Sequence, residues 1–362
     1  MSVEGHTQTP PPPPRDPNRK IERDLIKKLP KTDLHCHLDG SLRLSTVLEE
    51  AERQGIRLPA DTPEGLARAI HMGEVCADLE QYLEAFKVTL SVLQRAEALE
   101  RAAYELAMDC ATENVRWLEV RYAPILHQRE GLRLTTIVEA VVSGLKSAER
   151  DSGIRSGVIL CGVRNISAGS SLVLAELAVA YKNQGVIGFD LAGAEYNYPA
   201  KDHLAAFQLI RKNNVNCTAH AGEAYGPESI QQAIHNCGAH RIGHGTRLRE
   251  DGDLLNYFAD HRVPMEICLQ SNVQTRAVGS LKEHPLPFYL DYGLRVTLNT
   301  DNRLITNTTC TNEILLAHEH LGLDLQDIIR VLMAGFKSAF LPFHERKALL
   351  RQASQEISDV CG

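Results

Sequence analysis

Residues 31–41 read Lys-Thr-Asp-Leu-His-Cys-His-Leu-Asp-Gly-Ser, and this stretch decides the fold. We predict a short strand over residues 32–38 that carries His35 and His37. Alternate residues of a strand point to the same face, so the two imidazoles can converge on one metal ion. Cys36 lies between them on the opposite face, where we expect it to pack. If this strand opens a barrel, later strands should bring further ligands and a base to the same mouth.

Short apolar strand patterns alternate with helical patterns along the rest of the chain. Seven further strands are predicted, at residues 117–124, 157–164, 186–193, 215–220, 241–244, 264–269 and 295–301. Alternating strands and helices predict a parallel sheet, and eight such units match a (β/α)8 TIM barrel, an α/β fold. An open doubly wound sheet is the alternative, but no Gly-x-Gly-x-x-Gly or phosphate-loop motif supports it.

Extra helices are expected in two regions, after the first strand and at the C-terminal end. Apolar residues recur at helical spacing in segments 44–54, 79–93, 94–113, 312–320, 325–340 and 345–358. Thr62 followed by Pro63 is typical of a helix start, with Thr as N-cap and Pro in the first helical position. The predicted architecture is therefore a TIM barrel with additional helices.

The composition restricts the class of protein. The chain has 362 residues, 43% of them hydrophobic, which is ample for a buried core. A net charge of −7 without a Lys/Arg-rich run argues against a nucleic-acid partner. No apolar run reaches ~18 residues, so we expect no membrane span. Nine widely spaced cysteines without a Cys-x-x-Cys motif indicate reduced thiols and a cytoplasmic location.

The first 19 residues differ from the rest of the chain. They include five consecutive prolines at 10–14 and lack the apolar stretch of a secretory signal. We predict a disordered or polyproline II tail over 1–19, followed by a single metal-dependent domain over 20–362. A proline-recognising domain could bind this tail, but a passive tail is the favoured interpretation.

Residues able to bind metal or transfer protons cluster at the C-terminal ends of four predicted strands. They are His35, His37 and Asp39, then His220 and Glu223, then His244, and finally Asp301 and Asn302. Strand C-termini form the active-site mouth of such barrels. Three histidines and a carboxylate suit zinc, and a fourth histidine and a glutamate remain for proton transfer. A lone residue of this kind usually has a structural role, whereas the ordered set is specific.

Other polar residues receive structural interpretations. A second His-x-His pair, His318 and His320, falls on a predicted helix, where residues two apart diverge by about 200°. We therefore expect a solvated face there. Glu119 and Arg121 project to the same side of the second strand, and a buried ion pair between them is favoured over direct catalysis.

With these motifs the chain resembles the adenosine deaminase family of the amidohydrolase superfamily, from about residue 25 to about residue 345. The matching stretches are residues 31–41, 119–124, 188–193, 220–223, 241–245, 268–275 and 298–302. His-Ala-Gly-Glu at 220–223 and Arg-Ile-Gly-His-Gly at 241–245 are strong markers when they occur together.

The resemblance implies hydrolytic deamination of adenosine or 2′-deoxyadenosine to inosine or 2′-deoxyinosine, with one zinc ion per chain. The implied zinc ligands are His35, His37, His220 and Asp301. Zinc would make hydroxide available near neutral pH, and Asp301 would also hold it. Glu223 is similar to the acid that protonates purine N1 during attack at C6, which requires a raised pKa or a shared proton. His244 is similar to the residue that orients or deprotonates the water.

The resemblance also implies how a purine nucleoside is held. Gly193 resembles the backbone donor to purine N3, and Asp39 resembles the residue that binds the ribose 5′-hydroxyl and disfavours a 5′-phosphate. His37 is expected to contact substrate as well as metal. Four residues match the spacing of the family's apolar lid helix: Leu79, Tyr82, Leu83 and Phe86. A plain core face is the alternative interpretation of these four.

One position departs from the family pattern. The family usually has two consecutive aspartates at the end of the eighth strand, and here the pair is Asp301-Asn302. The second aspartate normally contacts purine N7, and an Asn amide can donate to N7 without needing a proton. Adenine, an adenine nucleotide or a modified adenosine is therefore an alternative substrate. A non-catalytic nucleoside-binding protein is disfavoured, because every expected catalytic residue is present.

Overall fold

The fold is described from a computed structural model that covers residues 20–71 and 76–361, so the predicted tail at 1–19 lies outside the described residues. Eight parallel strands follow one another as neighbours in chain order. They are β1 (Lys31–His37), β2 (Val115–Tyr122), β3 (Arg155–Val163), β4 (Val186–Ala192), β5 (Asn216–Ala221), β6 (Arg241–His244), β7 (Pro264–Ile267) and β8 (Arg295–Leu298).

The chain that follows β8 returns to β1 and closes the barrel. Cys36 and Asp301 form a parallel bridge. The backbone N–H of His37 donates to the carbonyl of Asp301 at 2.7 Å, and the N–H of Asp301 donates to the carbonyl of His35 at 2.8 Å. The predicted α/β TIM barrel is therefore confirmed. Its closure lies at the His-x-His stretch from which the barrel was predicted.

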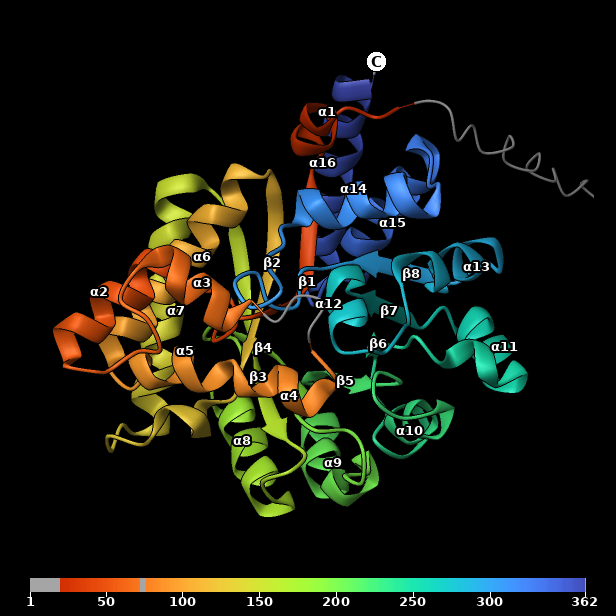
Figure 1. Cartoon of the computed structure of the whole chain (residues 1–362). Coiled ribbons are helices and arrows are strands. Elements are labelled where there is room, and N and C mark those ends of the chain that lie inside the picture. Colours follow the sequence, from red (N-terminus) through yellow and green to blue (C-terminus); the bar gives the residue numbers. More distant parts are fainter. Residues whose placement is uncertain (1–19, 72–75, 362) are drawn as a thin grey trace, which may run out of the picture.

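Helices surround the strands (Figure 1). Between β1 and β2 lie the predicted extra helices α2 (Leu44–Gln54), α3 (Pro63–Ile70), α4 (Leu79–Glu84), α5 (Phe86–Val92) and α6 (Ala96–Thr112). After β8 come α14 (Cys310–Leu321), α15 (Leu325–Ser338) and α16 (Phe343–Cys361), while α1 (Arg23–Lys28) precedes β1. The predicted start of α3 is confirmed, because Thr62 accepts the N–H of Gly65 at 3.2 Å.

The remaining helices connect consecutive strands. They are α7 (Leu134–Ser152), α8 (Ala168–Ala180), α9 (Leu204–Lys212), α10 (Pro227–Gln231), α11 (Gly252–His261), α12 (Leu269–Gln274) and α13 (Leu286–Asp291). Short helical turns add η2 (Pro124–His127), η3 (Ala200–His203), η4 (Gln232–Asn236), η5 (Leu248–Glu250) and η6 (Leu281–Glu283). Each connection leaves its strand at the C-terminal end, which is the end of the barrel where we expect the site.

The single helix expected over residues 79–93 is two helices, α4 and α5, with Ala85 between them. The N–H of Ala85 bonds to the carbonyl of Tyr82, and the N–H of Val88 bonds to the carbonyl of Ala85. Both bonds reach back three residues instead of four, which tightens the chain locally. Apolar spacing alone does not reveal this change.

The centre of the barrel holds charged side chains as well as apolar ones. Arg121 donates to Asp190 at 3.0 Å and to Glu266 at 2.8 Å. Arg241 donates to Glu266 at 2.6 Å and also pairs with Glu119. The expected ion pair between Glu119 and Arg121 is therefore wrong. Residues two apart on a strand are separated by about 7 Å, so side chains of other strands at the same level are closer partners.

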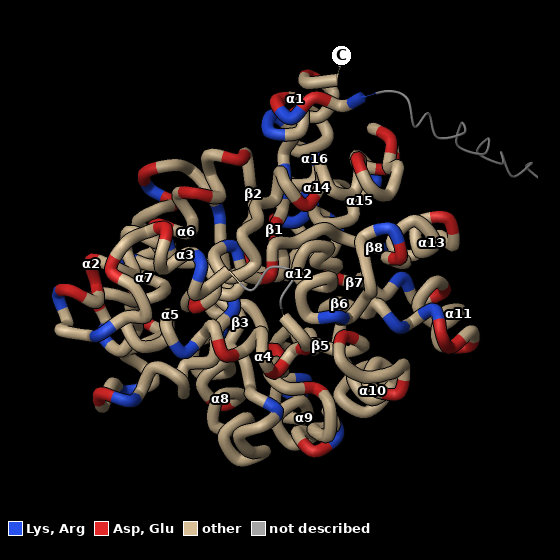
Figure 2. Tube along the Cα trace, viewed as in Figure 1, with Lys and Arg blue, Asp and Glu red and all other residues tan. Residues whose placement is uncertain are grey.

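Charged residues of both signs are interspersed over the outer helices (Figure 2). Among the helices within residues 20–71 and 76–361, none combines the length and the apolar character that a membrane crossing requires. All nine cysteines are free, and only Cys361 is exposed. Cys36 is fully buried in the core, as expected from its place opposite the two histidines.

Candidate functional site

Four side chains predicted as metal ligands come together where β1, β5 and β8 end. His35, His37, His220 and Asp301 each place one ligand atom within 4.8 Å of the other three. Oδ1 of Asp301 is 3.5 Å from Nε2 of His35 and 3.5 Å from Nε2 of His37. Nε2 of His37 is 3.1 Å from Nε2 of His220. Three imidazole nitrogens and a carboxylate oxygen thus form a candidate metal site.

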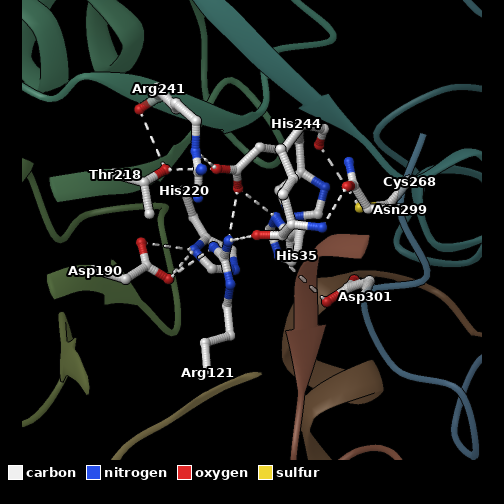
Figure 3. A network of polar contacts seen from close by, with 12 residues as sticks. His35, Arg121, Asp190, Thr218, His220, Arg241, His244, Cys268, Asn299 and Asp301 are labelled. Atoms are coloured by element: carbon white, nitrogen blue, oxygen red, sulfur yellow. Dashed lines mark hydrogen bonds and ion pairs between the residues drawn. The ribbon is translucent and has the colours of Figure 1, made fainter. Parts of the chain in front are cut away.

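Two of these imidazoles are oriented by carboxylates on their far side. Nδ1 of His35 is 3.0 Å from Oε2 of Glu266, and Nδ1 of His220 is 3.1 Å from Oδ2 of Asp190 (Figure 3). A carboxylate accepts the Nδ1 proton, which leaves the Nε2 lone pair free for a metal. Nε2 of His35 is buried without a hydrogen-bond partner in the described chain, so it lacks a contact that a cation would supply.

Asp301 is held as a carboxylate in a strained backbone position. Its Oδ2 accepts a hydrogen bond from Oγ of Ser271 at 2.5 Å. Burial alone would raise the pKa of Asp301, but the close approach of His35 and of the neighbouring histidines lowers the pKa far below its usual range. Asp301 has a φ of 58° and His244 has a φ of 64°. Non-glycine residues rarely adopt this region, and such strain concentrates at functional sites.

Glu223 and His244 stand beside the candidate metal site. Both side chains are buried, and Oε2 of Glu223 is 3.5 Å from Nε2 of His244. Burial, and after it the charge of Asp301, raises the pKa of Glu223 to about 8. A carboxyl group with this pKa is mostly protonated near neutral pH, so it can donate a proton or a hydrogen bond.

Asp39 is buried on the loop after β1. Its Oδ1 has no hydrogen-bond partner in the described chain, and its Oδ2 is 3.9 Å from Nε2 of His127. Burial raises the pKa of Asp39 to about 7 and lowers the pKa of His127 to about 4. An unpartnered buried carboxyl oxygen is open to a hydroxyl donor from a ligand.

Gly193 directly follows β4 and has a φ of 91°. A Cβ atom at this position would lie 2.8 Å from Oδ1 of Asn165 and 3.0 Å from Cγ1 of Val163. Both the backbone conformation and the close packing therefore require glycine.

Asn302 connects the end of the barrel to helix α4. Its Nδ2 donates to the hydroxyl of Tyr82 at 2.9 Å, and this hydroxyl is 2.6 Å from Oγ1 of Thr306. Oδ1 of Asn302 is buried without a hydrogen-bond partner in the described chain. Gly40 leaves room for this amide, since a Cβ on Gly40 would lie 1.9 Å from Oδ1 of Asn302.

The four expected lid residues are divided between two helices, and Tyr82 and Phe86 among them contact site residues. Leu79 and Tyr82 are buried on α4, where Leu83 is half-buried. Phe86 begins α5, and its ring centroid is 6.5 Å from that of His37. All four also belong to or pack against the main hydrophobic core, in agreement with the core interpretation, and the lid role stays a prediction.

A family model described as adenosine deaminase matches residues 30–356. The chain belongs to the adenosine deaminase family. It is 44% identical over 340 residues to an adenosine deaminase of Mycobacterium sp. (strain JLS), covering 90% of this chain and 94% of that protein. It is 41% identical over 324 residues to a probable adenosine deaminase of Dictyostelium discoideum, of which it spans 42%, while 90% of this chain is covered. The chain is therefore a deaminase enzyme.

Solved structures with the same fold include other deaminases. An adenine deaminase from Arthrobacter aurescens superposes with a TM-score of 0.85 at 27% identity, covering 91% of this chain and 99% of that one. An N6-methyl-AMP deaminase from Arabidopsis thaliana superposes with a TM-score of 0.80 at 27% identity, covering 92% of this chain and 98% of that one.

The loop that carries Glu223 in this deaminase is held by a carboxylate that sequence reasoning missed. Glu195, on the loop after β4, accepts the backbone N–H groups of four consecutive residues. They are Gly222 at 2.7 Å, Glu223 at 3.0 Å, Ala224 at 2.6 Å and Tyr225 at 3.1 Å. Hydrogen bonds to a carboxylate are stronger than neutral ones, so Glu195 fixes the backbone from which Glu223 projects. No local pattern reveals such a long-range contact.

Asp190 and Glu266, which orient two of the deaminase's histidines, left a signal in the sequence. Each is a single acidic residue inside an otherwise apolar strand, Phe189-Asp190-Leu191 and Met265-Glu266-Ile267. A charge at such a position is buried and needs partners. Their partners, however, lie on other strands and are visible only in the structure.

The second His-x-His pair of the deaminase is divided between two environments. His320 is exposed, as expected. His318 is half-buried, and its Nε2 accepts the N–H of Ile21 at 3.1 Å while its Nδ1 is 2.8 Å from the carbonyl of Leu323. The solvated face predicted for this pair is therefore wrong for His318, because the segment before α1 covers that side of α14.

Proposed function

We propose that this deaminase hydrolyses adenosine or 2′-deoxyadenosine to inosine or 2′-deoxyinosine and ammonia, with one zinc ion per chain. The observation that carries the proposal is the convergence of His35, His37, His220 and Asp301 beside a buried Glu223 whose pKa is raised. A relative named adenosine deaminase, at 44% identity, and one named probable adenosine deaminase, at 41%, support adenosine as the substrate.

The donor set supports zinc as the metal. Three imidazole nitrogens and one carboxylate oxygen are typical zinc ligands, and two of the imidazoles are already oriented by Glu266 and Asp190. When bound, zinc would make water a nucleophile near neutral pH. In this proposal the four converging side chains hold the ion.

The residues of the chain supply the proton transfers. The protonated carboxyl of Glu223 donates to purine N1, which draws electrons away from C6 as water oxygen attacks it. The ionised carboxylate of Asp301 accepts a hydrogen bond from that water and helps to orient it. One proton of the water passes by way of Asp301 to the amino group, the C6–N6 bond breaks and ammonia leaves. The other water proton restores the carboxyl of Glu223, and the ring keeps the N1 proton and the new oxygen at C6. Both roles require the opposite pKa shifts that burial and neighbouring charges give these two carboxyl groups.

The neighbouring residues would hold the nucleoside. We assign the backbone N–H of Gly193 to purine N3, the unpartnered Oδ1 of Asp39 to the ribose 5′-hydroxyl, and the amide of Asn302 to N7. His37, at the rim of the metal site, would contact the substrate as well. The expected lid residues on α4 and α5 would exclude water above the purine.

We further propose that residues 20–362 form one catalytic domain and that the protein is cytoplasmic. The barrel closes between β1 and the end of β8, which supports a single domain. Nine free cysteines support a reducing compartment.

A substrate panel tests the proposal. Loss of the 6-aminopurine ultraviolet spectrum, with release of ammonia or, from N6-methyl-AMP, of methylamine, should give the highest kcat/KM with adenosine or 2′-deoxyadenosine, compared with adenine, AMP and N6-methyl-AMP. The structures named adenine deaminase and N6-methyl-AMP deaminase make the last compounds the relevant competitors. A clear preference for one of these competitors would make that compound the substrate, while hydrolytic deamination would stay the proposed reaction. No release from any of them, despite one bound zinc, would favour a binding protein.

Asn302→Asp is expected to lower kcat/KM for adenosine by about fivefold or more at neutral pH. A carboxylate must first take up a proton before it can donate to N7, whereas the amide donates directly, and one hydrogen bond is worth about 1 kcal/mol. The control substrate is 7-deazaadenosine, which has no N7 acceptor. The variant and the wild type should differ far less in kcat/KM for this compound. Identical substrate profiles for the two proteins would make position 302 neutral.

The activity should fall as the pH rises through about 8. The pKa of Glu223 is raised to about 8, so its neutral acid form, which is the active form, prevails below that pH and is lost above it. Measurement of kcat/KM for adenosine on both sides of this value checks the expectation. A rate that stays flat or increases well above pH ~8 would show that the ionised carboxylate is active instead.

A further inference from the structure

His244 is the first member of a buried chain of hydrogen bonds that leads away from the candidate site. Its Nδ1 is 2.9 Å from Nδ2 of Asn272 on α12. Oδ1 of Asn272 is 3.2 Å from Nε2 of His284. Nδ1 of His284 accepts the backbone N–H of Leu286 at 3.1 Å, where α13 begins. The side chains of all four residues are buried.

The backbone N–H of Leu286 fixes the direction of every hydrogen bond in this series. A backbone N–H can only donate, so Nδ1 of His284 must be an acceptor and the proton of the neutral ring sits on Nε2. That proton requires an acceptor, which is Oδ1 of Asn272. The amide Nδ2 of Asn272 therefore faces His244 and donates to its Nδ1. A neutral His244 that accepts at Nδ1 carries its own proton on Nε2.

We propose that Asn272 and His284 are positioning residues that hold His244 as the Nε2–H tautomer, so that His244 offers a hydrogen-bond donor, and not a base, to the reacting atoms. The inference deepens the proposed function and rests on it. It decides between the two roles that the resemblance leaves open for this histidine, which are orienting the water and deprotonating it.

The position of Nε2 agrees with this role. It lies 3.5 Å from Oε2 of Glu223, the acid of the proposed mechanism. An Nε2–H at this place donates to an oxygen that gains negative charge, such as the attacking water as it loses its proton. For Nε2 to act as a base, the Asn272 amide would have to turn over, so that its oxygen faces His244. The proton of His284 would also have to move from Nε2 to Nδ1. The backbone N–H of Leu286 would then lose its acceptor.

Burial supports neutral rings for His244 and His284, the two histidines in this series of hydrogen bonds. Burial lowers the pKa of His284 to about 3, followed by a smaller effect of Arg249. Burial also lowers the pKa of His244 well below its usual value. Both rings therefore have one proton each, and the question is only which nitrogen carries it.

The proton position is directly measurable. In protein labelled with ¹⁵N in its histidine rings, long-range ¹H–¹⁵N spectra show which ring nitrogen bears hydrogen, and a His244→Gln spectrum assigns the signal. We expect His244 to have its proton on Nε2 both without metal and with zinc. Asn272→Asp replaces the donor with an acceptor, so a proton should appear on Nδ1. Asn256→Asp, on the exposed face of α11, introduces the same charge change and should leave the His244 signal unaltered.

Kinetics provide a second readout. Asn272→Asp should lower kcat for adenosine by at least about tenfold, because a catalytic histidine in the wrong tautomer is disabled, while KM should change by no more than about twofold. His284→Gln keeps an acceptor for Leu286 and a donor for Asn272, and should retain much more of kcat than His284→Leu. This rescue distinguishes a positioning role from loss of packing, since both replacements remove the ring.

Three results would overturn the inference. They are a wild-type His244 with its proton on Nδ1, an Asn272→Asp protein that keeps the Nε2–H tautomer, and equal kcat values for His284→Gln and His284→Leu. Failure of the proposed function would look different. The wild type would then release no ammonia from any aminopurine, while the spectra would still report the tautomer of His244.

Discussion

Replacing Glu223 with Gln is expected to lower kcat for adenosine by at least about 10²-fold, because an amide cannot supply the proton that purine N1 requires. Gln has nearly the size of Glu, and Glu195 holds the loop through backbone N–H groups that the substitution leaves intact. The fold and the bound zinc should therefore be unchanged. Steady-state kinetics, zinc analysis and circular dichroism on the same preparation check all three expectations.

Glu228→Gln is the matched control for this prediction. Glu228 is exposed in the first turn of α10, five residues after Glu223, and the same replacement there should leave kcat unaltered. A Glu223→Gln protein with near-normal turnover would remove Glu223 from the mechanism. Loss of zinc together with activity would instead show that Glu223 acts on the metal site.

Removing a single ligand should empty the metal site. We expect His35→Ala to lower zinc affinity by more than about 100-fold, since even the outer partners of zinc-binding histidines contribute about 10- to 100-fold. Asp301→Ala should have a comparable effect, because its carboxylate faces two of the three imidazoles. Titration with a competing chelator measures the affinity. Thermal unfolding with and without zinc gives an independent check, because zinc stabilises only a protein that binds it when folded.

His320→Ala provides the control for metal binding. It removes an imidazole from the other His-x-His pair, at an exposed position on α14, and should leave the zinc content at the wild-type level. Unchanged zinc affinity in His35→Ala and in Asp301→Ala would defeat the ligand assignment, whatever the activity of these variants.

The fold was predictable because its pattern is local. Most strands are short apolar runs between helical segments, and parallel strands place their C-terminal ends at one mouth of a barrel. His35, His220 and Asp301 end up close together for this reason, although 266 positions of the sequence separate the first from the last. The bridge between Cys36 and Asp301 shows that the barrel also closes at residues 31–41, the stretch from which the fold was predicted.

The environment of the site was not predictable, because it depends on which side chains share a level of the barrel. Glu266 illustrates this point. It contacts His35, Arg121 and Arg241, which belong to three other strands, and no sequence spacing connects them. Similarly, Glu195 holds the Glu223 loop from a neighbouring loop. Sequence reasoning selected the residues proposed for the chemistry, and the structure was required to find those that orient them.

The ultraviolet spectrum of zinc-loaded protein mixed with adenosine tests the central claim most directly. Conversion of the adenosine spectrum to that of inosine would establish the reaction, the atom attacked and the class of base in one measurement. The account predicts this conversion, and predicts that chelation of zinc abolishes it. No change with adenosine or with any other 6-aminopurine, from a protein that holds one zinc ion, would contradict it.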